Sequence, residues 1–207
     1  MDAVLETYEA TDFALWPVAD PSSDRLLVLS GELSERETGT AMAVLTGCNA
    51  GDQESTAAAV EDRVARQVGH LVTSDAVIAP GGLRLRDTTT GVTAPPGCCC
   101  GLEDWRDWLG LLNGEQPWLG HDPSPRVEHI GTSLRLWPDG ERPQGPHIVV
   151  PPGQLPELLC SVQQRLSGFL ACVAAWADRH APALSAAVVA RLDADLAIGA
   201  PLPDARG

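Results

Sequence analysis

One regular apolar repeat, over residues 155–176, constrains the fold more than any other feature of the chain. Apolar side chains recur there every three or four residues, the period of one face of an α-helix. They are Leu155, Leu158, Leu159, Val162, Leu166, Phe169, Leu170, Val173 and Trp176. At 3.6 residues a turn the repeat predicts a helix of about six turns. Pro156 falls in the first turn of this helix, where a missing N–H costs little. The apolar face of the helix has to be covered by the rest of the chain.

Three more segments have helical spacing. They span residues 52–74, 102–112 and 184–196. Asp52 or Ser55 is available to cap the first, Asn113-Gly114 is a typical stop for the second, and Pro182 begins the third. The sequence therefore predicts four helices, including a long C-terminal helix followed by a shorter one.

The remaining apolar runs predict antiparallel strands. In the first third they lie at residues 13–18, 25–29 and 41–45, with the acidic stretch 32–37 as a solvated loop or strand end. Further along they lie at residues 83–86, 127–130, 134–137 and 147–150, with hairpin turns at 88–91 and 138–140. We expect an α+β fold with an antiparallel sheet, built as a single domain over residues 1–200 with a frayed tail at 201–207.

The charge balance excludes several classes of function. The chain has 28 acidic and 14 basic residues, a net charge of −14, and every base is Arg because the sequence contains no Lys. A P-loop lysine and a Schiff-base lysine are therefore excluded. An acidic body repels nucleic acid and anionic membranes, and no run approaches the ~18 apolar residues of a membrane span. Since the first 20 residues lack the pattern of a secretory signal, we expect a cytoplasmic protein without nucleic-acid or membrane partners.

The segment Gly97-Cys98-Cys99-Cys100-Gly101 is the most unusual motif. In a reducing compartment its thiols favour packing, metal or redox roles over disulfides. Cys98 and Cys100 could chelate zinc as a C-x-C pair, and the start of the following helix could lower a thiol pKa. We favour packing under that helix, with a metal site and a reactive thiol as alternatives.

Imidazoles and carboxylates gather nearby, at His121-Asp122, Glu128-His129 and His147. A folded sheet could bring them to the cysteines, which makes Cys98, Cys100, His121 and His129 the candidate zinc ligands. Local hydrogen bonding in turns is the simpler interpretation of these residues.

Six of the nine aromatic residues are Trp, and they are natural core or interface anchors. We expect Trp105 in the core and Trp108 with Trp118 at the surface. Together with nearby acids they form the candidate contact set for a basic protein partner. The set is Trp108, Trp118, Glu32, Glu35, Glu37, Asp104 and Asp107.

The segment Leu102-Glu103-Asp104-Trp105-Arg106-Asp107-Trp108-Leu109, ending in Asn113-Gly114, resembles the aromatic helix and Asn-Gly pattern of the SUKH superfamily. Many members of that superfamily are immunity proteins that neutralise bacterial toxins. The resemblance implies an α+β fold without catalytic residues, acting by occlusion of a partner.

Three functions follow as hypotheses. The first is a non-enzymatic acidic binding protein, of the toxin-immunity or inhibitor type, that occludes a basic partner and needs no cofactor. The second is a metal- or thiol-dependent protein, with zinc as cofactor, centred on residues 98–100. The third is a structural subunit of a larger assembly. No familiar hydrolase, metalloprotease or dinucleotide motif is present in the sequence.

Overall fold

The computed structural model describes residues 1–50, 59–142 and 144–202. Within these residues the chain forms four α-helices, several 3₁₀ helices and two antiparallel sheets. The predicted α+β class is confirmed, and so is the long C-terminal helix followed by a shorter one. The predicted caps Asp52 and Ser55 lie outside the described residues, as does most of the predicted tail.

The strands form two separate antiparallel sheets. The first, in the order β2-β1-β3-β4, consists of β1 (Asp2–Glu6), β2 (Leu26–Val28), β3 (Gly81–Arg86) and β4 (Thr93–Ala94). The second, in the order β5-β6-β7, consists of β5 (Arg126–Ile130), β6 (Ser133–Trp137) and β7 (Ile148–Val150). The strands predicted from residue 83 onward are confirmed. Strand β1, which the prediction left out, is central because it pairs with β2 on one side and with β3 on the other.

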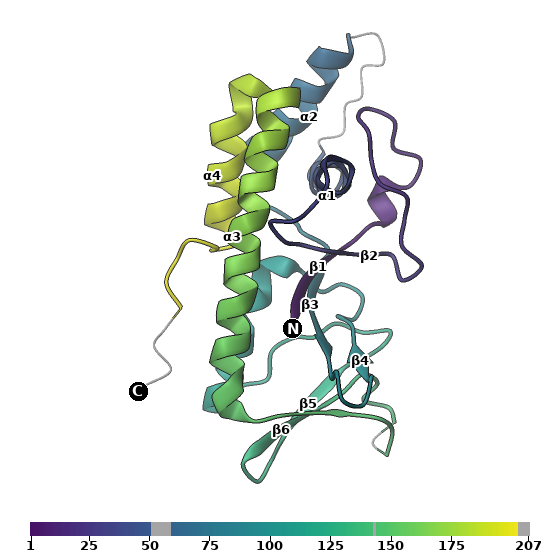
Figure 1. Cartoon of the computed structure of the whole chain (residues 1–207), viewed down its shortest axis with the longest axis vertical. Helices are drawn as coiled ribbons and strands as arrows, with labels where there is room; N and C mark the ends of the chain where they lie inside the picture. Colours follow the sequence, from purple (N-terminus) through teal and green to yellow (C-terminus); the bar gives the residue numbers. More distant parts are fainter. Residues whose placement is uncertain (51–58, 143, 203–207) are drawn as a thin grey trace.

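Figure 1 shows the longest helix running along most of the molecule, with a shorter helix beside its C-terminal half. The α-helices are α1 (Glu35–Cys48), α2 (Val60–Thr73), α3 (Leu155–His180) and α4 (Ser185–Asp195). The 3₁₀ helices are η1 (Tyr8–Ala10), η2 (Leu102–Asn113), η3 (Pro152–Gln154) and η4 (Pro182–Leu184). Helices α1, α2 and α4 all contact α3, so the apolar face of α3 is covered mainly by other helices.

Helix α1 corrects the prediction for the first third of the chain. Residues 41–45, expected as a strand, lie inside this helix, and its nine consecutive residues Thr38–Thr46 are all buried. A helix buried on every side has a continuous run of small and apolar residues, which periodicity cannot distinguish from a buried strand. The acidic stretch expected as a loop contains the helix start, where Ser34 and Glu37 form a capping box.

Residues 13–18 are also not a strand. Trp16 donates a hydrogen bond from Nε1 to the carbonyl of Gly39 (2.8 Å), and its ring packs edge-on against Trp176 with centroids 5.0 Å apart. The segment is therefore an irregular loop, and it is apolar because Trp16 anchors it on α1 and α3.

The buried apolar side chains form one cluster that includes residues of both sheets and of all four α-helices. One helical stretch of the described residues, Pro152–His180, is long and apolar enough to cross a membrane by length and composition, with a mean hydropathy of 1.3 over an 18-residue window. The core helix of a soluble protein meets the same criterion, and α3 buries eight of its residues inside the molecule. The absence of a membrane partner therefore stays a prediction.

Candidate metal centre

The cysteine run forms a tight turn on the surface between β4 and η2. The N–H of Cys100 donates to the carbonyl of Gly97 (3.4 Å), and Cys99, the third residue of the turn, has a φ of 61°. This left-handed position is usually taken by Gly or Asn. The turn exposes Cys98 and Cys99, whereas Cys100 is half-buried.

Backbone pairing brings His121 to this turn. Cys98 and His121 form an isolated antiparallel bridge, with hydrogen bonds of 2.5 Å and 3.1 Å between their backbones. Two glycines allow the approach, because a Cβ on Gly97 would lie 2.7 Å from the carbonyl carbon of Gly120. Residues more than 20 positions apart in the sequence are thus fixed against each other by main-chain contacts.

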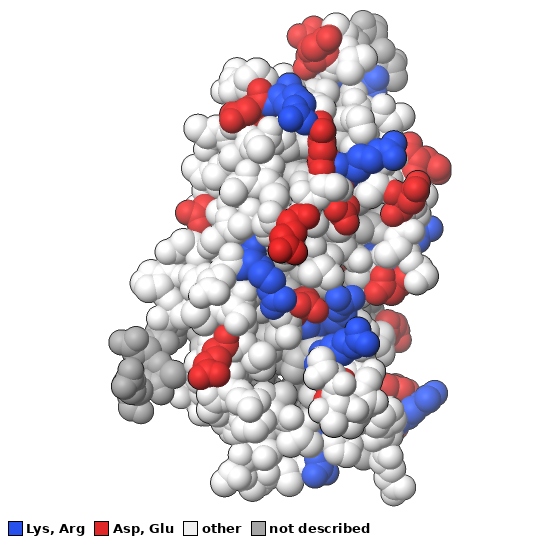
Figure 2. All heavy atoms as spheres, viewed as in Figure 1, with Lys and Arg blue, Asp and Glu red and all other residues white. Residues whose placement is uncertain are grey.

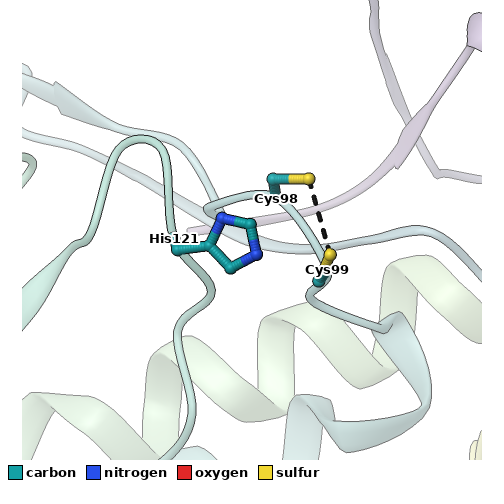
Figure 3. A group of neighbouring side chains, drawn as sticks. All are labelled: Cys98, Cys99 and His121. Carbon is teal, nitrogen blue, oxygen red and sulfur yellow. Dashed lines mark hydrogen bonds between the residues drawn. The ribbon is translucent and has the colours of Figure 1, made fainter.

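Three side chains with metal-ligating atoms meet at this bridge. The ligand atoms of Cys98, Cys99 and His121 all lie within 4.8 Å of one another, and the two Sγ atoms are 3.6 Å apart. Figure 3 shows the imidazole of His121 directed toward the two thiols. The side chains are exposed, so an ion can reach the group from solvent without any rearrangement of the core.

Neighbouring side chains orient the group. The carboxylate of Asp122 lies 3.2 Å from Nδ1 of His121, which leaves Nε2 as the free ring nitrogen. Trp118 donates from Nε1 to the carbonyl of Cys99 (3.4 Å), and its ring lies edge-on to His121 with centroids 6.4 Å apart. The aromatic ring therefore forms one wall of the candidate centre.

The electrostatics of the turn oppose a free thiolate. Burial raises the pKa of the Cys100 thiol to about 11, with smaller contributions from Asp104, Glu6 and Glu103. The pKa of Cys98 is also raised, first by its hydrogen bond with Cys99 and then by the charge of that neighbour. The helix start therefore does not lower the pKa of these two thiols, because burial of Cys100 and the hydrogen bond between Cys98 and Cys99 raise it, with nearby carboxylates as smaller causes. A raised pKa disfavours a thiolate nucleophile.

The predicted zinc ligands are only partly brought together. Cys98 and His121 belong to the group, but Cys99 takes the place expected for Cys100. The thiol of Cys100 points instead to the carbonyl of Trp118 (3.6 Å). His129 lies exposed on β5 outside the group, and His147 contacts the carbonyl of Gly145. The spacing could not identify Cys99, because the turn conformation decides which of three adjacent side chains point the same way.

Helix η2 explains why the predicted exposure of Trp108 is wrong. Its buried residues recur at every third position, and they are Leu102, Trp105, Trp108 and Leu111. In a 3₁₀ helix, with three residues per turn, side chains three apart are eclipsed and share one face. Trp105 is in the core as predicted, and Trp108 is buried beside it with 8% exposure. The strict three-residue spacing is the signal in the sequence that places Trp108 with Trp105 on the buried side.

The other predicted contact residues separate into two groups. Trp118 is exposed at 62%, and Asp104 and Asp107 are exposed on η2. Near α1, the carboxylate of Glu35 pairs with Arg179 and that of Glu37 accepts hydrogen bonds from Ser34 (2.8 Å and 2.6 Å). Both are therefore used within the molecule, whereas Glu32 is exposed beside them. On the face shown in Figure 2, acidic and basic side chains are interspersed and no single acidic patch forms.

A narrow cavity lies behind the turn, lined in part by Pro96, Cys100, Asp104, Trp108 and Trp118. Its volume is about 20 Å³, which is room for roughly one water molecule. It is too small for an organic ligand, so the candidate site is the exposed thiol and imidazole group itself.

Comparisons of the chain with protein-family models, with curated proteins and with solved structures gave no match. The resemblance to the SUKH superfamily therefore stays an expectation.

Proposed function

We propose that this protein binds a divalent transition metal, with zinc as the best fit, through Cys98, Cys99 and His121. The observation that carries the proposal is the meeting of these ligand atoms within 4.8 Å of one another on the surface. Cysteine and histidine are the preferred protein ligands of zinc.

The sulfur spacing supports tetrahedral coordination. Two sulfurs that are each about 2.3 Å from one zinc ion, at a tetrahedral angle, are about 3.8 Å apart. The observed distance between the Cys98 and Cys99 sulfurs is 3.6 Å. Trigonal or linear coordination would need a wider separation at the same bond length, so the pair suits zinc better than a metal of lower coordination number.

The chain supplies three ligands and leaves the fourth position to solvent or to another molecule. Three protein ligands with an open position are typical of zinc sites that bind a further ligand. Binding releases the two thiol protons, so affinity should increase with pH. All six cysteines are free thiols, in keeping with the reducing cytoplasm that we propose as the location.

The test is metal titration of the untagged full chain, purified without chelator. Cobalt(II) is the probe, because thiolate coordination gives it an intense charge-transfer absorption, and zinc displacement gives the zinc affinity. We expect about one equivalent of metal, lost in Cys99→Ser and in His121→Gln. Cys160→Ser and His129→Gln alter an exposed thiol and an exposed imidazole outside the group and should bind normally. Absence of metal from the wild-type chain, or equal affinity in all four variants, would refute the proposal.

A second candidate function is the non-enzymatic binding of a basic protein partner, of the immunity or inhibitor type. One observation favours it: Asp104, Asp107 and Glu115 form no ion pair with any described residue. The exposed Trp118 lines the same cavity as Asp104 and could stack on a cationic side chain.

An arginine-rich peptide tests this second function. Asp104→Asn with Asp107→Asn should weaken its binding and flatten the dependence on salt. Asp75→Asn with Asp178→Asn, which removes the same charge elsewhere, is the control. If the two double variants lost the same affinity for the peptide, the attraction would come from net charge alone, and the case for a specific binding surface would be removed.

A further inference from the structure

Two exposed thiols, those of Cys98 and Cys99, are adjacent in the sequence and also adjacent in space. Their sulfurs are 3.6 Å apart on one turn, whereas the third thiol of the run is directed to the carbonyl of Trp118. Cys48 and Cys172 are half-buried, and Cys160 is exposed on α3 outside any group of metal-ligating side chains among the described residues. Cys98 and Cys99 are therefore the pair of thiols in this chain that is placed to bind one atom together.

We infer that Cys98 and Cys99 capture trivalent arsenic, as arsenous acid or as a monosubstituted organoarsenical. The inference rests on the proposed metal site only in using the same two sulfurs. In the reaction each sulfur forms a bond to arsenic, each arsenic–oxygen bond that breaks releases its hydroxyl group, and each hydroxyl leaves with the thiol proton as water. Arsenic stays trivalent, so two thiols and one dihydroxyarsenic group give a cyclic dithioarsenite and two water molecules without any oxidant or reductant.

The geometry favours this ligand even without the imidazole that zinc needs. After the first sulfur has bonded, the second thiol is held 3.6 Å away on the same turn, so the ring closes in an intramolecular step. Trivalent arsenic forms three bonds in a pyramidal arrangement. Two go to the sulfurs and the third is the hydroxyl or carbon substituent that it keeps, so the imidazole of His121 is not required. The thiol protons leave with the departing hydroxyl groups, so the product carries no charged thiolate.

Two consequences separate the inference from the proposed function. Zinc needs both sulfurs and the imidazole, whereas the arsenical needs the sulfurs alone. Because the same sulfurs serve both, a bound metal should protect the turn. At a metal concentration of 100 times Kd, only about one site in a hundred is free, so the reaction of the two thiols with the arsenical should slow about a hundredfold.

The experiment uses the full chain and phenylarsine oxide, with intact-mass spectrometry under native conditions. We expect one adduct on the wild-type chain, on His121→Gln, on Cys100→Ser and on Cys160→Ser. We expect none on Cys98→Ser or Cys99→Ser, with circular dichroism used to confirm that these surface variants are folded. A His121→Gln chain that loses zinc but keeps the adduct supports the inference.

No adduct on the folded wild-type chain, or an adduct that persists in Cys99→Ser and is lost in Cys100→Ser, would overturn the inference. The two proposals can fail separately. A chain that binds zinc but takes no arsenical leaves the proposed function intact, and a chain that takes the arsenical through Cys98 and Cys99 but binds no zinc removes the proposed function alone.

Discussion

At the scale of single residues, the candidate centre depends on a glycine. A Cβ on Gly97 would lie 2.5 Å from the carbonyl oxygen of Pro123 and 2.7 Å from the backbone nitrogen of His121. Gly97→Ala should therefore force the turn away from the segment that holds His121, at a cost of about 1–3 kcal/mol in the free energy of unfolding. Urea denaturation measures that cost, and cobalt titration should show weaker binding.

Gly153→Ala is the matched control for this change, because nothing lies within 4 Å of the added methyl group. It should leave the stability unchanged or slightly raised. If both alanine variants behaved like the wild-type chain, the close approach of the two segments would not hold in solution.

Two half-buried thiols should make the folded protein less stable at alkaline pH. Burial is the main cause that raises the pKa of both Cys48 and Cys100 from 9.0 to about 11. The unfolded chain therefore loses these protons at lower pH than the folded chain. Their contribution to stability is fully present below pH 9 and is lost as the pH rises through about 11.

The composition makes this effect measurable. The chain has no Lys and a single Tyr, so few groups other than the six thiols titrate in this range. The urea midpoint should fall between pH 9 and pH 11, and it should fall less steeply in Cys48→Ser with Cys100→Ser. Identical slopes in the two proteins would show that the thiols are not protected by burial.

At the scale of elements, the start of α1 is set by its capping box. The Oγ of Ser34 accepts from the N–H of Glu37 (3.3 Å), and a carboxylate oxygen of Glu37 accepts from the N–H of Ser34 (2.8 Å). Ser34→Ala should lower the free energy of unfolding by about 1 kcal/mol. Ser167→Ala, an exposed change on α3, should alter it by no more than about 0.5 kcal/mol. A Ser34 variant as stable as the wild-type chain would mean that burial alone sets the helix start.

At the scale of the whole molecule, one core joins the two sheets and the helices, and we propose that residues 1–200 are one domain. Trp105 on η2 donates from Nε1 to the carbonyl of Leu196, just beyond α4, at 2.8 Å. Segments about 90 residues apart are thus linked by a buried hydrogen bond as well as by packing. Removal of this donor in Trp105→Phe leaves a buried carbonyl unsatisfied, at a cost of about 1–3 kcal/mol.

This architecture predicts one cooperative unfolding transition. Far-ultraviolet circular dichroism and Trp fluorescence should give the same urea midpoint in the wild-type chain, and both midpoints should shift together in Trp105→Phe. Separate midpoints for the two probes would contradict a single domain and would show that part of the structure unfolds independently.

The sequence by itself determined the elements whose pattern is local. The 3.6-residue repeat of α3, the Asn113-Gly114 stop of η2 and the strand alternation of β5 to β7 are readable because each element has one buried and one exposed side. The sequence did not predict helix α1, because a helix buried on every side has no 3.6-residue alternation of apolar and polar residues. Helix η2 was placed correctly but assigned the wrong pitch, and Trp108, which was expected at the surface, is buried.

Only the tertiary structure decided which side chains form the candidate centre. Composition pointed to the cysteine run, yet the choice of Cys99 over Cys100 depends on a single left-handed residue in the turn. The choice of His121 over His129 depends on a two-residue bridge between segments separated by η2. Local periodicity records which face of an element is buried, whereas a site made from two loops depends on backbone contacts that leave no repeat in the sequence.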